Sequence, residues 1–261
     1  MMFDTNVYFE YLAGKDSTTT VFGHDYLNVH RKRYEHTVRM LAPLRGTAAL
    51  EIGATDFFQL FLGNTLGFSD VWGTIFANSF EKKLTKQTFT AAGYSVESTV
   101  VDLQLENELF PIFEPRFDLV LLCEVIEHMD VDPMFCLIEL NRIIKPGGKL
   151  LITTPNICSA RNVYKICHGW RPHFYMQYHR DRSPYRHNFE HDVHSLIALV
   201  EAAGFSVVSL DTADVFEETD ERGLQLLKKN KLPLEHRGDD IFMLVEKTGQ
   251  PTERWPAGVY V

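Results

Sequence analysis

The sequence has too few basic residues to balance its acidic ones. Lysine and arginine number 26 against 35 aspartate and glutamate residues, which gives a formal net charge of -9. Broad, non-specific binding to nucleic acid or to an anionic membrane requires a basic surface, so the composition disfavours both. The basic residues between positions 161 and 186 are interpreted as a solvated loop. We therefore do not expect nucleic acid to be the partner.

Long apolar runs and paired cysteines are also missing. No run reaches the roughly 18 apolar residues that a membrane span needs, and the first residues, MMFDTNVYFEYLAG, do not resemble a secretory signal. The four cysteines, at 123, 136, 158 and 167, form no C-x-x-C pair and no zinc-finger spacing. Free thiols in a reducing compartment are the simplest interpretation, which predicts a soluble, cytoplasmic protein.

What the sequence contains is an alternation of apolar runs with segments of helical spacing. Hydrophobic residues make up 45% and charged residues 23% of the 261 positions, as in an ordinary globular domain. The predicted strands are 48–52, 71–76, 95–101, 117–123, 149–153, 205–210 and 241–246. The predicted helices are 26–41, 57–62, 80–92, 133–144, 192–203 and 223–229.

This order of elements predicts an α/β fold with a doubly wound, mostly parallel sheet. The run FDLVLLC at 117–123 is apolar on both faces, as in a parallel strand covered by helices on each side. We expect one domain over residues 1–261, with an N-terminal helical cap at 1–45. Residues 156–190 break the alternation and are predicted to form a lid over a binding site.

Three segments resemble class I S-adenosylmethionine (SAM)-dependent methyltransferases. They are LEIG at 50–53, FDLV at 117–120 running into CEVIEH at 123–128, and IKPGGKLLI at 144–152 followed by TPN at 154–156. The family fold implies a Rossmann-like sheet of seven strands with an antiparallel last strand. It also implies that SAM lies at the carboxyl ends of the strands.

The resemblance places cofactor contacts after three of the predicted strands. The residues concerned are Glu51, Gly53, Asp56, Asp102, Leu103 and Cys123. The family loop reads E-x-G-x-G-x-G, but Thr55 and Phe57 stand where the second and third glycines are expected. The acid expected at the end of the second strand is replaced by Ile75 or Phe76. Asp56 is the candidate to contact the ribose or the methionine amine instead.

A group of acidic and imidazole side chains follows the predicted strand 117–123. Glu124, Glu127 and His128 have i, i+3 and i+4 spacing, so they share one face if a helical turn begins there. Two carboxylates and an imidazole can hold a divalent metal such as Mg²⁺, with His187 or His191 as a fourth ligand. The alternative is a site without metal, in which His128 is a general base and Glu127 caps a helix or pairs with an arginine.

The E-V-x-E-H pattern is similar to that of metal-assisted O-methyltransferases. These include small-RNA 2′-hydroxyl methyltransferases and ubiquinone-pathway enzymes, and the RNA enzymes also have stretches like TPN at 154–156 and HNFE at 187–190. The resemblance implies that a metal would lower the pKa of an acceptor hydroxyl.

These features predict a SAM-dependent methyltransferase that acts on a hydroxyl of a small molecule or saccharide. Its catalytic residues would be His128, Glu124 and Glu127. The aromatic, arginine and histidine residues of 156–190 suit such an acceptor. Two alternatives remain: N-methylation of an amino sugar, and a non-catalytic methyltransferase-like protein that serves as a scaffold or binds another ligand. The missing loop glycines and acid favour the non-catalytic reading, whereas the intact Glu-Glu-His group favours an enzyme.

Overall fold

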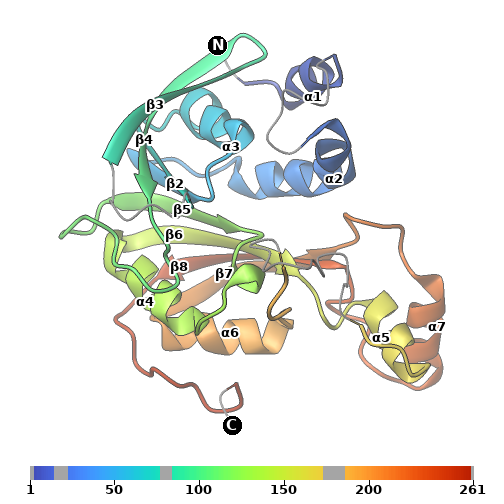
Figure 1. Ribbon diagram of the computed structural model, residues 1–261. Coiled ribbons are helices and arrows are strands. Elements are labelled where there is room, and N and C mark those ends of the chain that lie inside the picture. Colours follow the sequence, from blue (N-terminus) through green and yellow to red (C-terminus); the bar gives the residue numbers. More distant parts are fainter. Residues whose placement is uncertain (1–2, 15–22, 77–83, 173–185, 260–261) are drawn as a thin grey trace.

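A mixed sheet forms the centre of the computed structural model, which describes residues 3–14, 23–76, 84–172 and 186–259. Within these residues eight strands have the order β3-β4-β2-β1-β5-β6-β8-β7 (Figure 1). The strands are β1 (Ala48–Ile52), β2 (Asp70–Ile75), β3 (Leu84–Ala91), β4 (Tyr94–Asp102), β5 (Phe117–Cys123), β6 (Ile144–Pro155), β7 (Phe205–Ala213) and β8 (Asp240–Lys247). The predicted α/β class is confirmed, with one strand more than the seven expected.

The five central strands, β4-β2-β1-β5-β6, are parallel to one another. β8 is antiparallel to both β6 and β7, and β3 is antiparallel to β4. Because the central strands are parallel, their carboxyl ends lie together along one edge of the sheet, where open α/β sheets bind their ligands.

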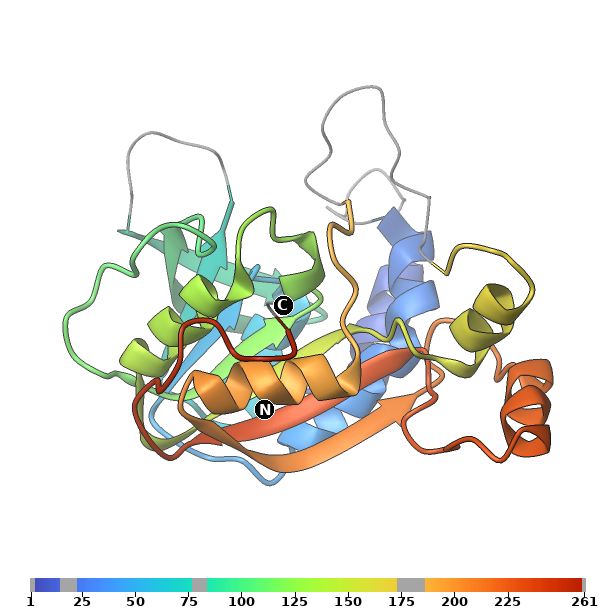
Figure 2. The same ribbon diagram turned by 90° about the horizontal axis from the view of Figure 1, so that it is seen from below.

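Helices cover both faces of the sheet. The helices are α1 (Thr5–Ala13), α2 (Gly23–Leu41), α3 (Asp56–Leu60), α4 (Pro133–Ile143), α5 (Ala160–Cys167), α6 (Val193–Ala202) and α7 (Glu221–Lys229), with a π-helical turn at Phe61–Thr65 and a 3-10 turn at Ile126–His128. α1, α2 and α3 lie on one face, and α4 and α6 lie on the other (Figures 1 and 2). α5 and α7 pack against each other beside the sheet.

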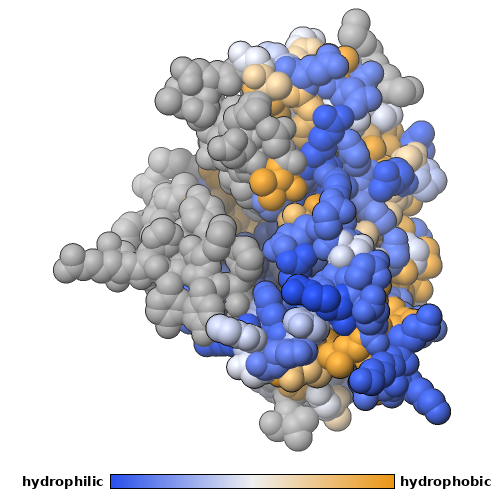
Figure 3. Space-filling model, turned by 90° about the vertical axis from the view of Figure 1, so that its right-hand side faces the viewer, coloured by the Kyte–Doolittle hydropathy of each residue, from blue (hydrophilic) through white to orange (hydrophobic). Residues whose placement is uncertain are grey.

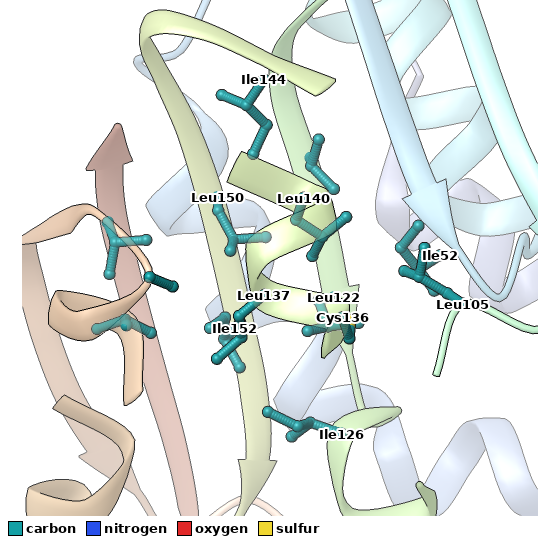
Figure 4. Packing of buried hydrophobic residues seen from close by; sticks show 14 of the residues in the cluster. Ile52, Leu105, Leu122, Ile126, Cys136, Leu137, Leu140, Ile144, Leu150 and Ile152 are labelled. Carbon is teal, nitrogen blue, oxygen red and sulfur yellow. The ribbon is translucent and has the colours of Figure 1, made fainter. Parts of the chain in front are cut away.

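Apolar side chains from the strands pack against the helices on each face. On the α4 side, Leu122, Leu150 and Ile152 meet Leu137 and Leu140, all of them fully buried (Figure 4). Burying each such side chain contributes about 1.5–3 kcal/mol to folding. The buried aromatic residues of α1, α2 and α3 belong to a second cluster on the opposite face, together with aliphatic residues of the strands.

The predicted helix at 80–92 is wrong over residues 84–91, which form β3; residues 80–83 lie outside the described part of the chain. β3 pairs with β4 in unbroken antiparallel register from Leu84↔Val101 to Ala91↔Tyr94. The turn between them consists of Ala92 and Gly93, both with positive φ (52° and 79°), as in a two-residue hairpin turn. Gly93 therefore closes a hairpin and does not end a helix.

The α1 helix was not among the individually predicted helices, although it lies in the segment 1–45 that was expected to form a helical cap. Asp4 caps it by accepting hydrogen bonds from the backbone N–H groups of Asn6 and Val7. The preceding Phe3 ring lies 5.1 Å from the ring of Tyr94 at the β3–β4 turn. α1 thus covers the sheet beside β4 and α3.

Among the described helices, none has both the length and the apolar character needed to span a bilayer.

Candidate active site

The loop after β1 is held by side-chain hydrogen bonds. Gly53 has a φ of +75°, and its N–H donates to Thr74 Oγ1 at 3.0 Å. Glu51 Oε1 accepts from the N–H of Thr55 at 3.0 Å and from its Oγ1 at 2.7 Å. Glu51 Oε2 accepts from Gln59 Nε2 at 2.8 Å. Because both of its carboxylate oxygens accept hydrogen bonds from within the protein, Glu51 stabilises the conformation of the loop.

Ala54 requires a glycine on the neighbouring strand. A Cβ atom added to Gly73 of β2 would lie 2.6 Å from Ala54 Cβ and 3.2 Å from Gln59 Nε2. We expect Gly73→Ala to lower the free energy of unfolding by about 1–3 kcal/mol through overpacking. Chemical denaturation measures this. Gly249→Ala is the control, since a Cβ there meets nothing within 4 Å; equal stability of the two variants would contradict the packing argument.

Burial of Glu51 makes stability depend on pH. Removal from water raises the pKa of Glu51 from 4.5 to about 8, although the hydrogen bonds from Gln59 and Thr55 oppose the rise. The folded state therefore binds the proton more tightly than the unfolded state, so this contribution is full below pH 4.5 and is lost as the pH rises to about 8. We expect Glu51→Gln to have a smaller fall in Tm between pH 5 and 9 than the unmodified protein, measured by thermal unfolding.

The two positions that lack family glycines have structural roles. Thr55 is the N-cap of α3, where its Oγ1 accepts from the N–H of Phe58 at 3.2 Å. Phe57 points away from the loop surface and is 1% exposed. Its ring packs between α1 and α2, with centroid distances of 5.2 Å to Tyr8 and 4.6 Å to Tyr34.

The proposed cofactor residues lie along the carboxyl ends of β1, β4 and β5. Gly53 is exposed on the loop after β1, and Asp56 is exposed at the start of α3. Asp102 ends β4 opposite Ile75, while the Leu103 side chain is buried and its N–H donates to the Ile75 carbonyl at 3.0 Å. Cys123 ends β5 and is partly buried. Phe76, which follows β2 where an acid was expected, is 53% exposed.

Glu127, His128 and His187 converge beyond the end of β5. One ligand atom of each residue lies within 4.8 Å of those of the other two. The rings of His128 and His187 are 4.9 Å apart, centroid to centroid. The N–H of Asn188 donates to the Glu127 carbonyl at 2.7 Å, which fixes the later segment on the turn after β5. The structure thus joins residues about 60 positions apart, as the metal hypothesis requires.

Glu127 is a buried carboxylate, and one of its two oxygens has no hydrogen-bond donor among the described residues. It is 1% exposed, and Oε2 accepts from Thr154 Oγ1 at 3.1 Å. Oε1 accepts no hydrogen bond from any described residue. It lies 3.6 Å from His128 Nε2, beyond hydrogen-bond length. Burial and the nearby Glu124 raise the pKa of Glu127 well above its usual range, so a cation beside Oε1 would stabilise its charged form.

Both imidazoles of the group are oriented by acceptors. His128 Nδ1 lies 3.1 Å from the Arg186 carbonyl, and burial, followed by His187, lowers the pKa of His128 to about 4. His128 is therefore neutral at pH 7, the form that can bind a metal or accept a proton. His187 Nδ1 lies 3.1 Å from Oε1 of the buried Glu190. Such a carboxylate contact fixes the ring of a metal-binding histidine.

Glu124 and His191 are placed differently from the other candidates. The 3-10 turn begins at Ile126, so Glu124 is not on its face; it has a φ of +53°, and its Oε1 accepts from Thr153 Oγ1 at 2.7 Å. The expected helical face is therefore wrong for Glu124, although its charge still acts on Glu127. His191 is 1% exposed beside Asn156, outside the group of three.

The family assignment follows from a comparison of the sequence with family models. The model described as a methyltransferase domain matches residues 20–210. The chain belongs to this methyltransferase family. Its fold class and the carboxyl-edge position of the candidate site agree with the class I SAM-dependent members that the sequence resembles.

Three solved structures have the same fold. A chain from the complex between the Haloferax volcanii Trm112 methyltransferase activator and a methyltransferase has a TM-score of 0.55 and 14% identity, covering 92% of this chain and 97% of that one. A SAM-dependent methyltransferase from Archaeoglobus fulgidus has a TM-score of 0.54, 18% identity and coverage of 84% and 94%. The N-methyltransferase NodS from Bradyrhizobium japonicum, solved with S-adenosylhomocysteine, has a TM-score of 0.51, 11% identity and coverage of 93% and 98%. No curated protein matches the sequence significantly.

The methyltransferase motif TPN at 154–156 links the candidate site to the end of the chain. Thr154 holds Glu127, as described above. Asn156 is buried, and its Nδ2 donates to the carbonyls of His236 and Gly238 at 3.0 and 2.8 Å. The likeness of this motif to a stretch of RNA methyltransferases did not indicate that Asn156 holds the loop before β8.

The segment predicted as a lid is described only in part, because residues 173–185 lie outside the described chain. They include His173, Phe174, Tyr175, Tyr178, His179 and Tyr185. Part of what is described forms α5, which packs on α7 where Gly223 meets the backbone of Ala160. Residues 186–190 bring His187 and Glu190 to the candidate site. Trp170 is 73% exposed after α5. The described surface on this side of the methyltransferase is mainly hydrophilic with scattered apolar residues (Figure 3).

Proposed function

We propose that this methyltransferase transfers the methyl group of SAM to a hydroxyl of a small molecule or saccharide, with a divalent cation beside the acceptor. The observation that carries the proposal is the convergence of Glu127, His128 and His187 at the edge of the sheet where the acceptor should lie. A carboxylate and two imidazoles suit Mg²⁺ poorly by ligand softness but suit Mn²⁺, Co²⁺ or Zn²⁺ well.

The charge state and hydrogen bonding of Glu127, His128 and His187 suit the binding of a divalent cation. Glu127 Oε1 is buried and accepts no hydrogen bond from a described residue, and an unsatisfied buried carboxylate oxygen costs free energy that a cation offsets. His128 is neutral, and Glu190 orients His187. Glu127, His128 and His187 would hold the ion, and Glu124 would add negative charge nearby. When bound, such an ion lowers the pKa of an acceptor hydroxyl.

The cofactor side of the proposal rests on the loop after β1. Hydrogen bonds to Glu51 and Thr74 hold its backbone in place. We propose that Gly53, Asp56, Asp102, Leu103 and Cys123 line the SAM site. Methyl transfer from a sulfonium is an in-line displacement, so the protein has mainly to align the acceptor with the methyl group and exclude water.

Calorimetric titration with SAM and S-adenosylhomocysteine tests the cofactor site. We expect micromolar dissociation constants for both (of order −8 kcal/mol) and a clear loss of affinity in Asp102→Ala. Glu221→Ala, on the exposed start of α7, is the matched control. Absence of binding to the unmodified protein would overturn the proposal and favour the non-catalytic alternative.

Transfer of a labelled methyl group from SAM tests the acceptor. Hydroxyl-bearing acceptors, from catechols to free sugars, are compared with their amino analogues, with Mn²⁺ and with a chelator. The proposal expects transfer to hydroxyls that the chelator abolishes. Transfer to amines that a chelator does not affect would overturn it and support N-methylation, the activity in the name of the NodS relative.

A further inference from the structure

The chain after β8 turns back toward the edge of the sheet where the candidate site lies. β8 ends at the opposite, amino edge, because Glu246 pairs with Lys149 of β6, and Lys149 pairs with Leu119 near the start of β5. The tail, residues 248–259, then passes over α6 and α4 (Figure 2). It therefore brings the end of the described chain toward the elements that follow β5.

Three kinds of contact anchor the tail along this course. The N–H of Thr252 donates to the carbonyl of Ala202, the last residue of α6, at 2.9 Å. The guanidinium of Arg254 forms an ion pair with the carboxylate of Asp132. Val259 packs against the buried apolar cluster on the α4 side of the sheet. A backbone bond, a charge pair and an apolar contact thus fix one short segment.

Asp132 is the last residue of the turn that carries two of the candidate ligands. It follows His128 by four residues, and its Oδ1 accepts from the N–H of Met134 at 2.8 Å, which caps α4. The ion pair with the tail uses its other oxygen, Oδ2. Within the turn, the N–H of Asp130 donates to Glu106 Oε2, from the loop after β4, at 2.7 Å. Two neighbouring segments therefore hold the end of the turn that is remote from β5.

We propose that the tail holds this turn in the position that Glu127 and His128 need to bind the cation, and that Arg254 is a positioning residue acting through Asp132. Groups that bind a ligand have to stay within about 0.5 Å of their working geometry, and a turn fixed at one end only would move by more. The inference rests on the proposed function for what the turn binds. The anchoring of the turn by the tail stands independently of it.

Hydrogen exchange of the backbone amides of residues 124–132 tests the anchoring without any ion, because exchange reports local opening. We expect exchange about 2- to 5-fold faster in Arg254→Gln, as for loss of a partly exposed ion pair. A larger rise is expected when Val259→Ser is added. Arg254→Lys keeps the charge and should restore the rates of the unmodified protein.

The matched control is Arg222→Gln. Arg222 pairs with Asp220 at 2.9 Å, and Asp220 is the N-cap of α7, so the control also removes an arginine from the cap of a helix. It should leave the exchange of residues 124–132 unchanged, because α7 lies beside the sheet with α5. Unchanged exchange in the Arg254→Gln and double variants, or an equal rise in the control, would overturn the anchoring.

Mn²⁺ titration by calorimetry separates positioning of the site from simple docking of the tail. We expect Arg254→Gln to weaken Mn²⁺ binding by about 2- to 5-fold, with affinity restored in Arg254→Lys and unchanged in Arg222→Gln. Faster exchange with unchanged Mn²⁺ affinity would overturn the positioning role. If the unmodified protein binds no Mn²⁺, the proposed cation fails, whereas hydrogen exchange still decides whether the tail anchors the turn.

Discussion

Glu127→Gln is expected to lose divalent-cation binding and methyl transfer while it keeps SAM affinity. The substitution preserves the size of the side chain and one oxygen, but it removes the charge that faces His128 and His187. Residues that only support a metal site contribute about 10- to 100-fold to affinity, so removal of a charged ligand should cost at least about 100-fold. Mn²⁺ titration, SAM titration and single-turnover transfer of labelled methyl measure the three quantities.

A buried glutamate far from the site provides the control for this variant. Glu139 on α4 is 3% exposed and pairs with Arg142 at 2.6 Å. Glu139→Gln should lower stability but leave Mn²⁺ affinity unchanged. If Glu127→Gln binds Mn²⁺ as tightly as the unmodified protein, the cation binds elsewhere and Glu127 has a structural role only. If both SAM binding and Mn²⁺ binding are lost, the variant has disturbed the whole carboxyl edge.

Phe57→Gly is expected to destabilise the protein strongly, although it restores a glycine that the family loop has at this position. Aromatic rings with centroids within 5.7 Å of the Phe57 ring are Phe3, Tyr8, Phe9, Tyr34 and Phe58. Loss of a buried phenylalanine costs about 3–5 kcal/mol, and glycine within a helix costs about 1 kcal/mol more. Denaturant unfolding should therefore show a much lower midpoint, with α1 and α2 loosened from α3.

Phe113→Gly controls for the loss of an aromatic side chain, because Phe113 is 96% exposed. Its effect on the free energy of unfolding should be within about 0.5 kcal/mol, as for other surface substitutions. A small effect of Phe57→Gly would mean that the aromatic cluster contributes little to stability. The divergence of the loop from the family pattern would then need another explanation.

Most of the sheet could be predicted from the sequence because its signals are local. The apolar runs at 48–52 and 117–123 match β1 and β5 residue for residue. The hairpin at 84–102 was missed because Gly93 suits the end of a helix as well as a two-residue turn. Only the positive φ of Ala92 and the pairing of β3 with β4 separate these alternatives.

The candidate site was predicted in part. Glu127 and His128 were identified by spacing and resemblance, and His187 by the later histidine stretch. The supporting residues Thr154 and Glu190 were not identified as such, because each comes from a different segment and has no spacing relation to the motif. The loop substitutions at Thr55 and Phe57 suggested a damaged cofactor loop, yet both side chains have packing or capping roles.

The sequence by itself determined the α/β class, the order of the central strands along the chain and the residue types at the carboxyl edge. Hydrophobic periodicity and turn residues involve neighbouring positions in the chain, so they can be recognised from the sequence alone. The tertiary structure alone decided that His187 meets Glu127 and His128, and that α1 packs on Phe57. These contacts join residues far apart in the chain, and packing of side chains against the sheet, which no local pattern encodes, brings them together.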